Sequence, residues 1–260
     1  MTATATATAA LRLIDVARSF GGVAAVDGVT FSVEPGEQFG VIGPNGAGKT
    51  SLLNCLNGIY PIDRGEAWLG EVRIDKLRPH QITARGIART FQGADLFPEF
   101  DVVNYLLLGR LRFTRHSLVG CSLALPGVRR SESRERSRVI GLLEEFGFGH
   151  LRGARVGDLP YGTRKILDVV RALAMEPRVL LLDEPTSGTT SSDRERLRDV
   201  VAGIRAKGVT TMVVDHDVAF ISANCDRVLA MNFGRKLSIG TPGQVLAEPE
   251  VRASYLGTET

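Results

Sequence analysis

The sequence predicts an α/β fold in which helices flank a mainly parallel β-sheet, with an antiparallel β-rich N-terminal part and an inserted α-helical subdomain. Three observations predict it. The first third of the chain contains short β-rich runs broken by glycine and proline turns. From about residue 97 to 156 the apolar residues return at helical spacing instead. After residue 158, apolar strands alternate with amphipathic helices, as in a parallel sheet covered by helices.

Strands dominate the first part of the chain. The runs LRLIDVARSF (11–20), VTFSVEPGE (29–37) and EQFGVIG (37–43) end at Gly-Gly, Pro-Gly and Gly-Pro-Asn-Gly turns. The third run enters a glycine loop, and the segment TSLLNCLNGIY after that loop is helical up to Gly58. The run GEAWLGEVRI (65–74) predicts a further pair of strands joined at a glycine.

Helical spacing marks the insertion, in DVVNYLLLGRLRF (101–113) and SESRERSRVIGLLEEFGF (131–148). The alternation of strands and helices then resumes. We expect, in order, a helix over 164–175, a strand over 178–185, a helix over 192–208, a strand over 209–217, a hairpin over 226–240 and two short helices over 241–257.

The length and composition are those of a globular protein. A chain of 260 residues with 43% hydrophobic and 23% charged residues can bury a large core in one domain that carries an inserted subdomain. The net charge of +3 is too small to indicate a nucleic-acid partner. The three cysteines lie far apart without a CxxC pair, so the sequence indicates neither a disulfide framework nor a zinc site and favours reduced thiols.

The N-terminal run MTATATATAA has neither the basic nor the apolar region of a secretory signal. No apolar run approaches the roughly 18 residues that a membrane span requires, so any membrane spans must come from another chain. We expect a disordered tail over 1–9, one domain over 10–240 with its core in 10–96 and 157–240 and its helical insertion in 97–156, and short C-terminal helices over 241–260.

The segment GPNGAGKTS matches the pattern G-x-x-x-x-G-K-[ST] in full, between a strand and a helix. In this context the glycines let backbone N–H groups converge on phosphate oxygens, and the helix N-terminus adds its dipole. We expect Lys49 to reach the β- and γ-phosphates and Thr50 to offer its hydroxyl to Mg²⁺. The motif predicts a P-loop NTPase (RecA-like) whose nucleotide contacts Gly43, Pro44, Asn45, Gly46, Ala47, Gly48, Lys49, Thr50 and Ser51.

The run VLLLDEP (179–185) is an apolar strand that ends in two carboxylates. The pair alone could serve only as a helix N-cap. Beside a P-loop, both motifs fall at the carboxyl ends of one sheet, where ligands bind. We therefore expect Asp183 to hold Mg²⁺ and Glu184 to polarise the attacking water.

Two further polar residues follow predicted strands. A lone histidine is usually structural or merely exposed, but His216 in VVDHD ends a third strand of the same sheet edge and could contact the γ-phosphate. Gln92 in RTFQG could contact Mg²⁺ or the water, and an ordinary polar loop residue is an equal alternative.

The P-loop, RTFQ, a glycine-bearing helix start, LLLDEP and VDHD, in this order, resemble the ATP-binding subunit of an ABC transporter from about residue 11 to 257. The resemblance implies an ATPase with ATP and Mg²⁺ as cofactors. It implies that Gln92 is the metal-contacting glutamine of the Q-loop and His216 the switch histidine, both catalytic with Lys49 and Glu184. Phe20 resembles the aromatic that stacks on adenine, and a hydrophobic strand-end residue is an equal alternative.

The segment DLPYGTRK (158–165) falls where the family has its LSGGQ-like signature. The resemblance therefore implies that Pro160, Tyr161 and Gly162 contact the nucleotide of a second ATPase subunit in a head-to-tail dimer. Thr163 and Thr190 depart from the family pattern, Thr190 where an acidic or amide residue is usual. We expect these departures to affect coupling between the two nucleotide sites and leave hydrolysis intact.

The segments GIARTFQ, LFPEFDVVNYLLLGR and the tail over 240–257 resemble, more narrowly, the ATPase subunits of branched-chain amino-acid importers, a group that shades into importers of urea and short amides. The resemblance implies two membrane permease subunits, a second ATPase that is a copy or a paralogue, an indirect solute-binding partner and a peripheral position on the cytoplasmic face of the inner membrane.

Other functional classes agree less well with the sequence. A soluble ABC ATPase acting on nucleic acid or ribosomes would usually carry two cassettes or a long coiled coil, and this chain has one P-loop and no heptad array, so no nucleic acid is expected. In a small-molecule kinase the signature-like helix and His216 would have no role. The arginines of the insertion favour a solvated helix face over contact with anionic lipid.

Overall fold

The computed structural model describes residues 9–90, 97–113 and 126–256. The described chain forms two compact units. Unit 1 comprises Met1–Arg89, Arg178–Ser187 and Ile204–Thr260, and unit 2 comprises Thr90–Pro177 and Gly188–Gly203. The predicted tail over 1–8 and the predicted site residue Gln92 lie outside the described residues.

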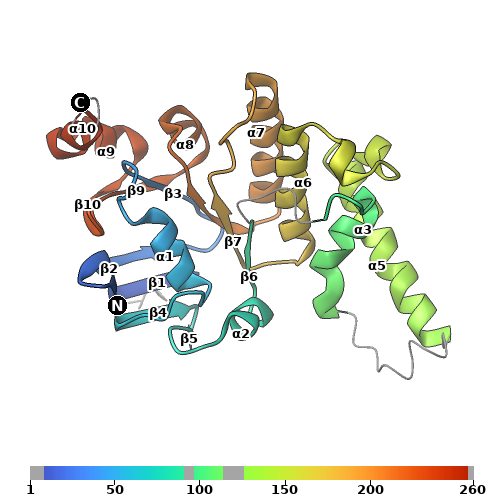
Figure 1. Cartoon of the computed structure of the whole chain (residues 1–260), viewed down its shortest axis with the longest axis horizontal. Helices are drawn as coiled ribbons and strands as arrows, with labels where there is room; N and C mark the ends of the chain where they lie inside the picture. The colour runs from blue at the N-terminus through green and yellow to red at the C-terminus, as the bar shows by residue number, and fades with distance from the viewer. Residues whose placement is uncertain (1–8, 91–96, 114–125, 257–260) are drawn as a thin grey trace, which may run out of the picture. The chain divides into compact units, whose positions relative to one another are not determined.

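A six-stranded sheet forms the centre of unit 1 (Figure 1). Four neighbouring pairs are parallel and only the edge strand β10 is antiparallel, which confirms the predicted mainly parallel sheet. The three strands at its centre are buried along their whole length, as expected for strands covered on both faces. In spatial order the strands are β10 (Arg235–Gly240), β9 (Arg227–Asn232), β3 (Gln38–Ile42), β8 (Thr210–Val214), β7 (Val179–Asp183) and β6 (Ile87–Arg89).

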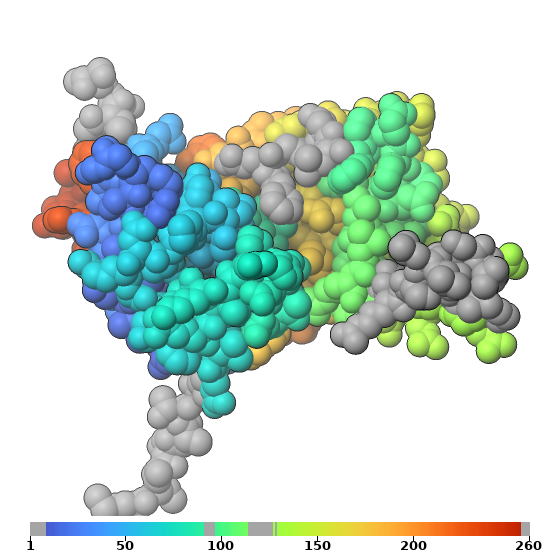
Figure 2. Space-filling model, turned by 60° about the horizontal axis from the view of Figure 1, so that its bottom comes forward, coloured from blue at the N-terminus to red at the C-terminus, as the bar shows by residue number. Residues whose placement is uncertain are grey.

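A second sheet of unit 1 is four-stranded and antiparallel, as predicted for the N-terminal part. Its order is β2 (Val23–Val33), β1 (Leu11–Phe20), β4 (Arg64–Leu69) and β5 (Val72–Arg73). Strand β2 begins at Val23, earlier than the predicted start at residue 29, because two glycines with positive φ close a tight hairpin after β1. Figure 2 shows β1 and β2 in dark blue beside the lighter blue and teal segment of β4, β5 and α2 (Pro79–Ala84).

One hydrophobic core joins both sheets of unit 1. The rings of Phe31 in β2 and Phe39 in β3 stack with centroids 5.1 Å apart. Helix α1 (Lys49–Leu56) adds Leu52, Leu53 and Leu56 to this core, each fully buried. Burial of a leucine side chain stabilises by about 1.5–3 kcal/mol, so the start of α1 is firmly placed against the sheet.

The remaining helices of unit 1 are short. They are α2 (Pro79–Ala84), α8 (Val218–Asn224), α9 (Pro242–Ala247) and α10 (Pro249–Leu256). Asp217 caps α8 by accepting the Phe220 N–H, and Thr241 caps α9 in a capping box with Gln244.

Unit 2 is built from helices. They are α3 (Val102–Leu107), the 3₁₀ segments η1 (Leu108–Phe113), η2 (Gly149–Leu151) and η3 (Val156–Asp158), α5 (Pro126–Glu145), α6 (Tyr161–Ala174) and the larger part of α7 (Ser191–Ala206). The predicted helix over 101–113 is α-helical only in α3 and tightens to 3₁₀ in η1. There the backbone lies so close to α6 that a Cβ on Gly109 would stand 2.4 Å from the Arg171 carbonyl oxygen.

Within the described part of the chain, no helix has both the length and the apolar character needed to cross a membrane. The longest helix, α5, carries nine charged residues in PGVRRSESRERSRVIGLLEE, so it is far too polar for a lipid core.

Candidate functional site

The loop Gly43–Gly48 connects β3 to α1 and ends at the N-terminus of that helix. Helix α1 has no side-chain cap and no acidic residue in its first turn. Its first N–H groups therefore lack the intrahelical partners that later residues have, and they point with the positive end of the helix dipole toward the loop. This is the local geometry of an anion site, and it sits where the sequence predicts the P-loop.

Gly48 shows why this loop needs glycine. It has φ +95, and a Cβ at this position would lie 2.1 Å from the Ala25 carbonyl oxygen. The loop can thus pack directly against β2 only because position 48 has no side chain. Gly43 and Gly46 also have positive φ.

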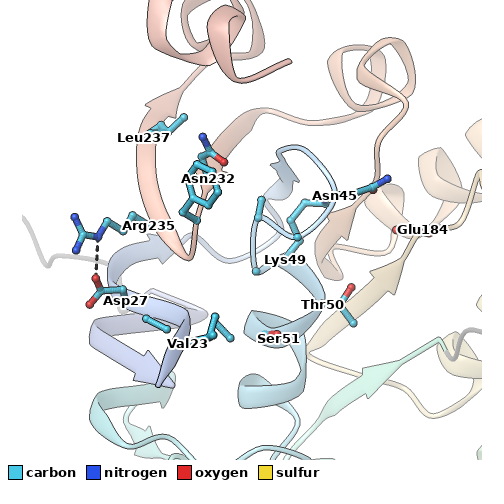
Figure 3. A pocket seen from close by; sticks show the side chains of 16 residues that line it. Val23, Asp27, Asn45, Lys49, Thr50, Ser51, Glu184, Asn232, Arg235 and Leu237 are labelled. Atoms are coloured by element: carbon cyan, nitrogen blue, oxygen red, sulfur yellow. Dashed lines mark hydrogen bonds and ion pairs between the residues drawn. The ribbon is translucent and has the colours of Figure 1, made fainter. Parts of the chain in front are cut away.

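A cavity of about 700 Å³ opens over this loop. Figure 3 shows the labelled side chains Asn45, Lys49, Thr50 and Ser51 on one side of it, and Asn232, Arg235 and Leu237 from the β9–β10 segment on another. Glu184 also lines the cavity. The structure therefore brings the predicted residues Asn45, Gly46, Ala47, Gly48, Lys49, Thr50, Ser51 and Glu184 to one cavity.

The Lys49 side chain is buried and curls over the loop. Its Nζ donates hydrogen bonds to the carbonyl oxygens of Gly43 (2.6 Å) and Pro44 (2.9 Å). Burial lowers the pKa of Lys49, and the negative charges of Glu184 and Asp183 oppose that shift. An anion in the cavity would favour the charged ammonium further.

The two predicted carboxylates lie at the end of β7, Asp183 as its last residue and Glu184 directly after it. The Asp183 carboxylate is buried and pairs with the Arg89 guanidinium at 2.7 Å, and Arg89 also donates to Asn54 Oδ1 at 2.6 Å. Glu184 has φ +46, a left-handed conformation that is uncommon for a residue with a side chain, and its N–H bonds the Val214 carbonyl at 2.7 Å. Strained backbone of this kind concentrates at functional sites.

Arg89 and Asn54 were not among the predicted site residues. The sequence shows Arg89 only as a charged residue at the end of a short apolar run, because its partner Asp183 lies 94 residues further along the chain. Asn54 lies inside α1, and no sequence pattern around it marks it as a site residue.

A second network missed by sequence reasoning surrounds Asp215, which directly follows β8 and is fully buried. Its carboxylate accepts the Thr186 N–H (3.0 Å), the Thr186 hydroxyl (2.7 Å) and the Asp217 N–H (2.9 Å). Asp215 therefore ties the segment after Glu184 to the segment that carries His216. The Nδ1 atom of His216 lies 3.6 Å from Asp215 Oδ1, and the imidazole is largely exposed.

Phe20 is not among the residues that line the cavity. Its ring packs edge-on against Tyr60, with centroids 4.9 Å apart, and the Arg18 guanidinium lies 4.5 Å from its centroid. Gln92 lies outside the described residues, so the structure gives it no place.

The predicted signature residues belong to unit 2. Pro160 is the N-cap of α6, and this helix, like α1, has no side-chain cap bond and no acidic residue in its first turn. The ring of Tyr161 packs on Gly188, where a Cβ would lie 2.9 Å from the ring. At Gly162 a Cβ would lie 2.1 Å from Asp193 Oδ2, so the segment after β7 rests directly on the start of α6. Thr163 is buried behind it.

Comparison with known proteins identifies the family. The family described as ABC transporter matches residues 26–187, more than half of the chain. The chain belongs to the ABC transporter family. It is an ATP-binding cassette ATPase, which confirms the resemblance and the P-loop NTPase fold predicted from the sequence.

Individual relatives match almost the whole cassette. The high-affinity branched-chain amino acid transport ATP-binding protein BraF of Pseudomonas aeruginosa is 35% identical over 239 residues, which cover 92% of this chain and 94% of BraF. The high-affinity branched-chain amino acid transport ATP-binding protein LivG of Escherichia coli K12 is 34% identical, and the match again covers 92% of this chain and 94% of the relative. The ADP conformation of an ATP-binding cassette of an ABC transporter superposes with a TM-score of 0.84 at 28% identity, covering 96% of this chain and 99% of that structure.

The structure also accounts for Thr190, which departs from the usual pattern of ABC cassettes. Thr190 precedes α7, and its hydroxyl accepts the Asp193 N–H at 3.2 Å while Asp193 Oδ2 accepts the Thr190 N–H at 3.0 Å. The Thr190 hydroxyl also donates to Asp193 Oδ2 at 2.7 Å. This is a reciprocal capping box, and the same Asp193 rests on Gly162. The pattern T-x-x-D was visible in the sequence.

We expect Thr190→Val to destabilise the cassette by about 1 kcal/mol, the usual loss for an N-cap. Thr190→Ser should keep the stability, because it retains the hydroxyl, and Ser191→Ala is the matched control one residue on. Urea unfolding of the purified chain measures the differences. Equal midpoints for Thr190→Val and Ser191→Ala would show that the capping box contributes nothing.

Proposed function

We propose that this chain is the ATP-binding and ATP-hydrolysing subunit of an ABC importer for branched-chain or other hydrophobic amino acids. The observation that carries the proposal is the 34–35% identity to BraF and LivG over 92% of the chain. The cavity over an uncapped helix N-terminus supports the nucleotide part, because phosphates bind at such ends.

The predicted site residues suit ATP and Mg²⁺. The loop N–H groups and Lys49 would hold the phosphates. The Thr50 hydroxyl and the Asp183 carboxylate are hard oxygen donors of the type that Mg²⁺ prefers, and Gln92 is the third proposed ligand. Bound Mg²⁺ supplies charge neutralisation at the phosphates.

Glu184 is the proposed general base. It directly follows Asp183, the last residue of β7, lines the cavity and is held by the bond of its N–H to Val214. His216 is proposed to contact the γ-phosphate, and the Asp215–Thr186 bonds connect its segment to that of Glu184.

Two ATPase subunits are proposed to bind ATP between them. The uncapped start of α6, with Pro160, Tyr161 and Gly162, would offer its N–H groups to the γ-phosphate held by a second subunit. ATP would then favour the closed pair and hydrolysis the open one, because only the triphosphate contacts both chains. Two permease subunits would bring this pair to the cytoplasmic face of the membrane, and a solute-binding protein would deliver the amino acid.

The test is reconstitution of the chain in liposomes with its permease pair and its solute-binding protein. We expect leucine, isoleucine or valine to stimulate ATP hydrolysis and to accumulate inside the vesicles. Lys49→Ala should abolish both signals, because the ammonium that meets the phosphates is gone. Stimulation by urea or a short amide, without uptake of the three amino acids, would contradict the proposed substrate class.

A further inference from the structure

We propose that Arg89 is an internal counter-ion of Asp183, and that it competes with the Mg²⁺ of the bound nucleotide for this carboxylate. The inference rests on the proposed function, because it takes Asp183 as a metal ligand. It goes beyond that function in giving a role to an arginine of β6, a strand that carries none of the other proposed site residues. The extent to which the metal strengthens nucleotide binding is then set by a cation of this chain.

The first observation is a buried ion pair. Arg89 Nη2 lies 2.7 Å from Asp183 Oδ2, and the two side chains are 8% and 1% exposed. A buried carboxylate needs a cation or hydrogen-bond donors, because an unpaired charge away from water is strongly unfavourable. Arg89 meets this need from the neighbouring strand, since β6 and β7 pair in parallel with Arg89 opposite Leu181 (Figure 1).

The second observation is that the same guanidinium reaches helix α1. Its Nη1 donates to Asn54 Oδ1 at 2.6 Å. Asn54 lies one turn after Thr50, so both residues belong to the same side of α1. The positive charge of Arg89 therefore connects the two elements that carry the proposed metal ligands Thr50 and Asp183.

The charge of Asp183 also acts on the phosphate loop. It opposes the lowering of the Lys49 pKa that burial causes. A cation held by phosphates on this loop would be attracted by the same carboxylate, because charges in a buried site are only weakly screened. Arg89 and such a cation therefore share one negative partner.

The third observation is that Arg89 is a costly residue if its role is only structural. Its Nε is buried and has no hydrogen-bond partner within the described part of the chain. A buried ion pair often stabilises a fold no more than an apolar pair of similar volume does. A buried arginine with an unsatisfied donor therefore indicates a use for its charge.

Two cations beside one buried carboxylate repel each other. Each weakens the other's hold on the carboxylate, as like charges do at close range. Without Arg89, the Asp183 carboxylate would draw more of its countercharge from the metal. Removal of the arginine charge should therefore weaken nucleotide binding in a chelator and increase the contribution of the metal.

The experiment is calorimetric titration of the full chain with AMP-PNP, an ATP analogue that is not hydrolysed, in EDTA and in Mg²⁺. The ratio of the two affinities measures how much the metal strengthens nucleotide binding. We expect Arg89→Gln to raise this ratio roughly tenfold, within the usual range for coupling between two sites. Arg89→Lys should give nearly the wild-type ratio, since it keeps the charge. Arg85→Gln is the matched control, an exposed arginine of unit 1 just before β6.

Thermal unfolding in EDTA distinguishes this role from a purely structural one. Arg89→Gln should lower Tm, because Asp183 loses the guanidinium, and the double variant Arg89→Gln with Asp183→Asn should recover much of the loss. AMP-PNP with Mg²⁺ should raise Tm by more in Arg89→Gln than in the wild-type chain. A purely structural arginine would lower both nucleotide affinities alike and leave their ratio unchanged.

The wild-type chain offers a measurement that does not depend on the folding of a neutral variant. The Arg89 Nε is buried, so its proton is protected from exchange with water and can be observed by NMR. Its resonance is assigned by its absence in Arg89→Lys. We expect this resonance to shift when Mg²⁺ is added to the AMP-PNP complex.

An unchanged or smaller ratio in Arg89→Gln would overturn the proposal, and so would an equal rise in Arg85→Gln or an Arg89 resonance that Mg²⁺ leaves in place. Nucleotide binding that Mg²⁺ strengthens in no variant would refute the metal role of Asp183, and with it the competition, but would leave the nucleotide site standing. A wild-type chain that binds AMP-PNP in neither buffer would contradict the proposed function and this inference together.

Discussion

The Glu184→Gln variant is expected to hydrolyse ATP roughly 10²–10⁴-fold more slowly than the wild-type chain in the assembled transporter, the usual range for loss of a general base. Glutamine has the size of glutamate and can keep the N–H bond to Val214, so the cavity retains its shape. It cannot accept the proton of the attacking water. ATP affinity should therefore stay within a few-fold of wild type, since the phosphate loop is untouched.

Phosphate release under saturating ATP measures this effect, and calorimetry of the isolated chain measures affinity. Glu71→Gln is the matched control, because Glu71 is an exposed glutamate of unit 1 in the β4–β5 turn. Hydrolysis by Glu184→Gln at the rate of Glu71→Gln would refute the role of Glu184. Removal of the Asp183 carboxylate should differ from removal of the Glu184 carboxylate. Asp183 is buried and pairs with Arg89, so its loss should reduce the stability of the fold as well as hydrolysis.

The Arg110→Ala variant is expected to lose about 3–5 kcal/mol of stability, the range for removing one partner of a buried ion pair. Arg110 is 2% exposed, and its Nε donates to Glu135 Oε2 at 2.6 Å. Its Nη1 donates to the Ala174 carbonyl and to Glu176, each at 2.7 Å. One guanidinium thereby connects η1, α5 and the end of α6, and its removal leaves Glu135 buried without its main partner.

Urea unfolding of the full chain measures the loss, followed by far-UV circular dichroism. Arg138→Ala is the matched control, because Arg138 pairs with the same Glu135 at 3.2 Å but is 51% exposed, and exposed pairs contribute at most about 1 kcal/mol. The double variant Arg110→Met with Glu135→Leu should recover much of the stability, since it removes both buried charges. Similar losses for Arg110→Ala and Arg138→Ala would contradict the assignment.

The burial of Arg110 also corrects an expectation. The sequence groups this residue with the arginines of a solvated helix face, and Arg134, Arg136 and Arg138 of α5 are indeed exposed. Arg110 is not part of that face. The spacing of charged residues predicts the solvent-exposed face of a segment only if that segment is a surface α-helix. Residues 108–113 instead form a 3₁₀ segment that packs against α6.

The sequence by itself determined the phosphate loop, the strand ends that carry Asp183 and His216, and the order of strands and helices along the chain. These features are local. A loop of nine consecutive residues, or a run of apolar residues that ends in a carboxylate, can be recognised from neighbouring residues alone. The capping box of Thr190 is equally local, because its partner is three residues away, but it was not among the predicted features.

The tertiary structure alone decided which residues meet. Arg89 pairs with Asp183, Thr186 with Asp215, and the turn at Gly234 bonds Ala47, although tens to nearly two hundred residues separate these partners in the sequence. Each contact depends on the spatial order β10-β9-β3-β8-β7-β6, which places β8 and β9, from the C-terminal part of the chain, on the two sides of β3. Local periodicity fixes whether a segment is a strand, but the strand order follows from packing of the whole core. Only that order brings the turn between β9 and β10 to the phosphate loop.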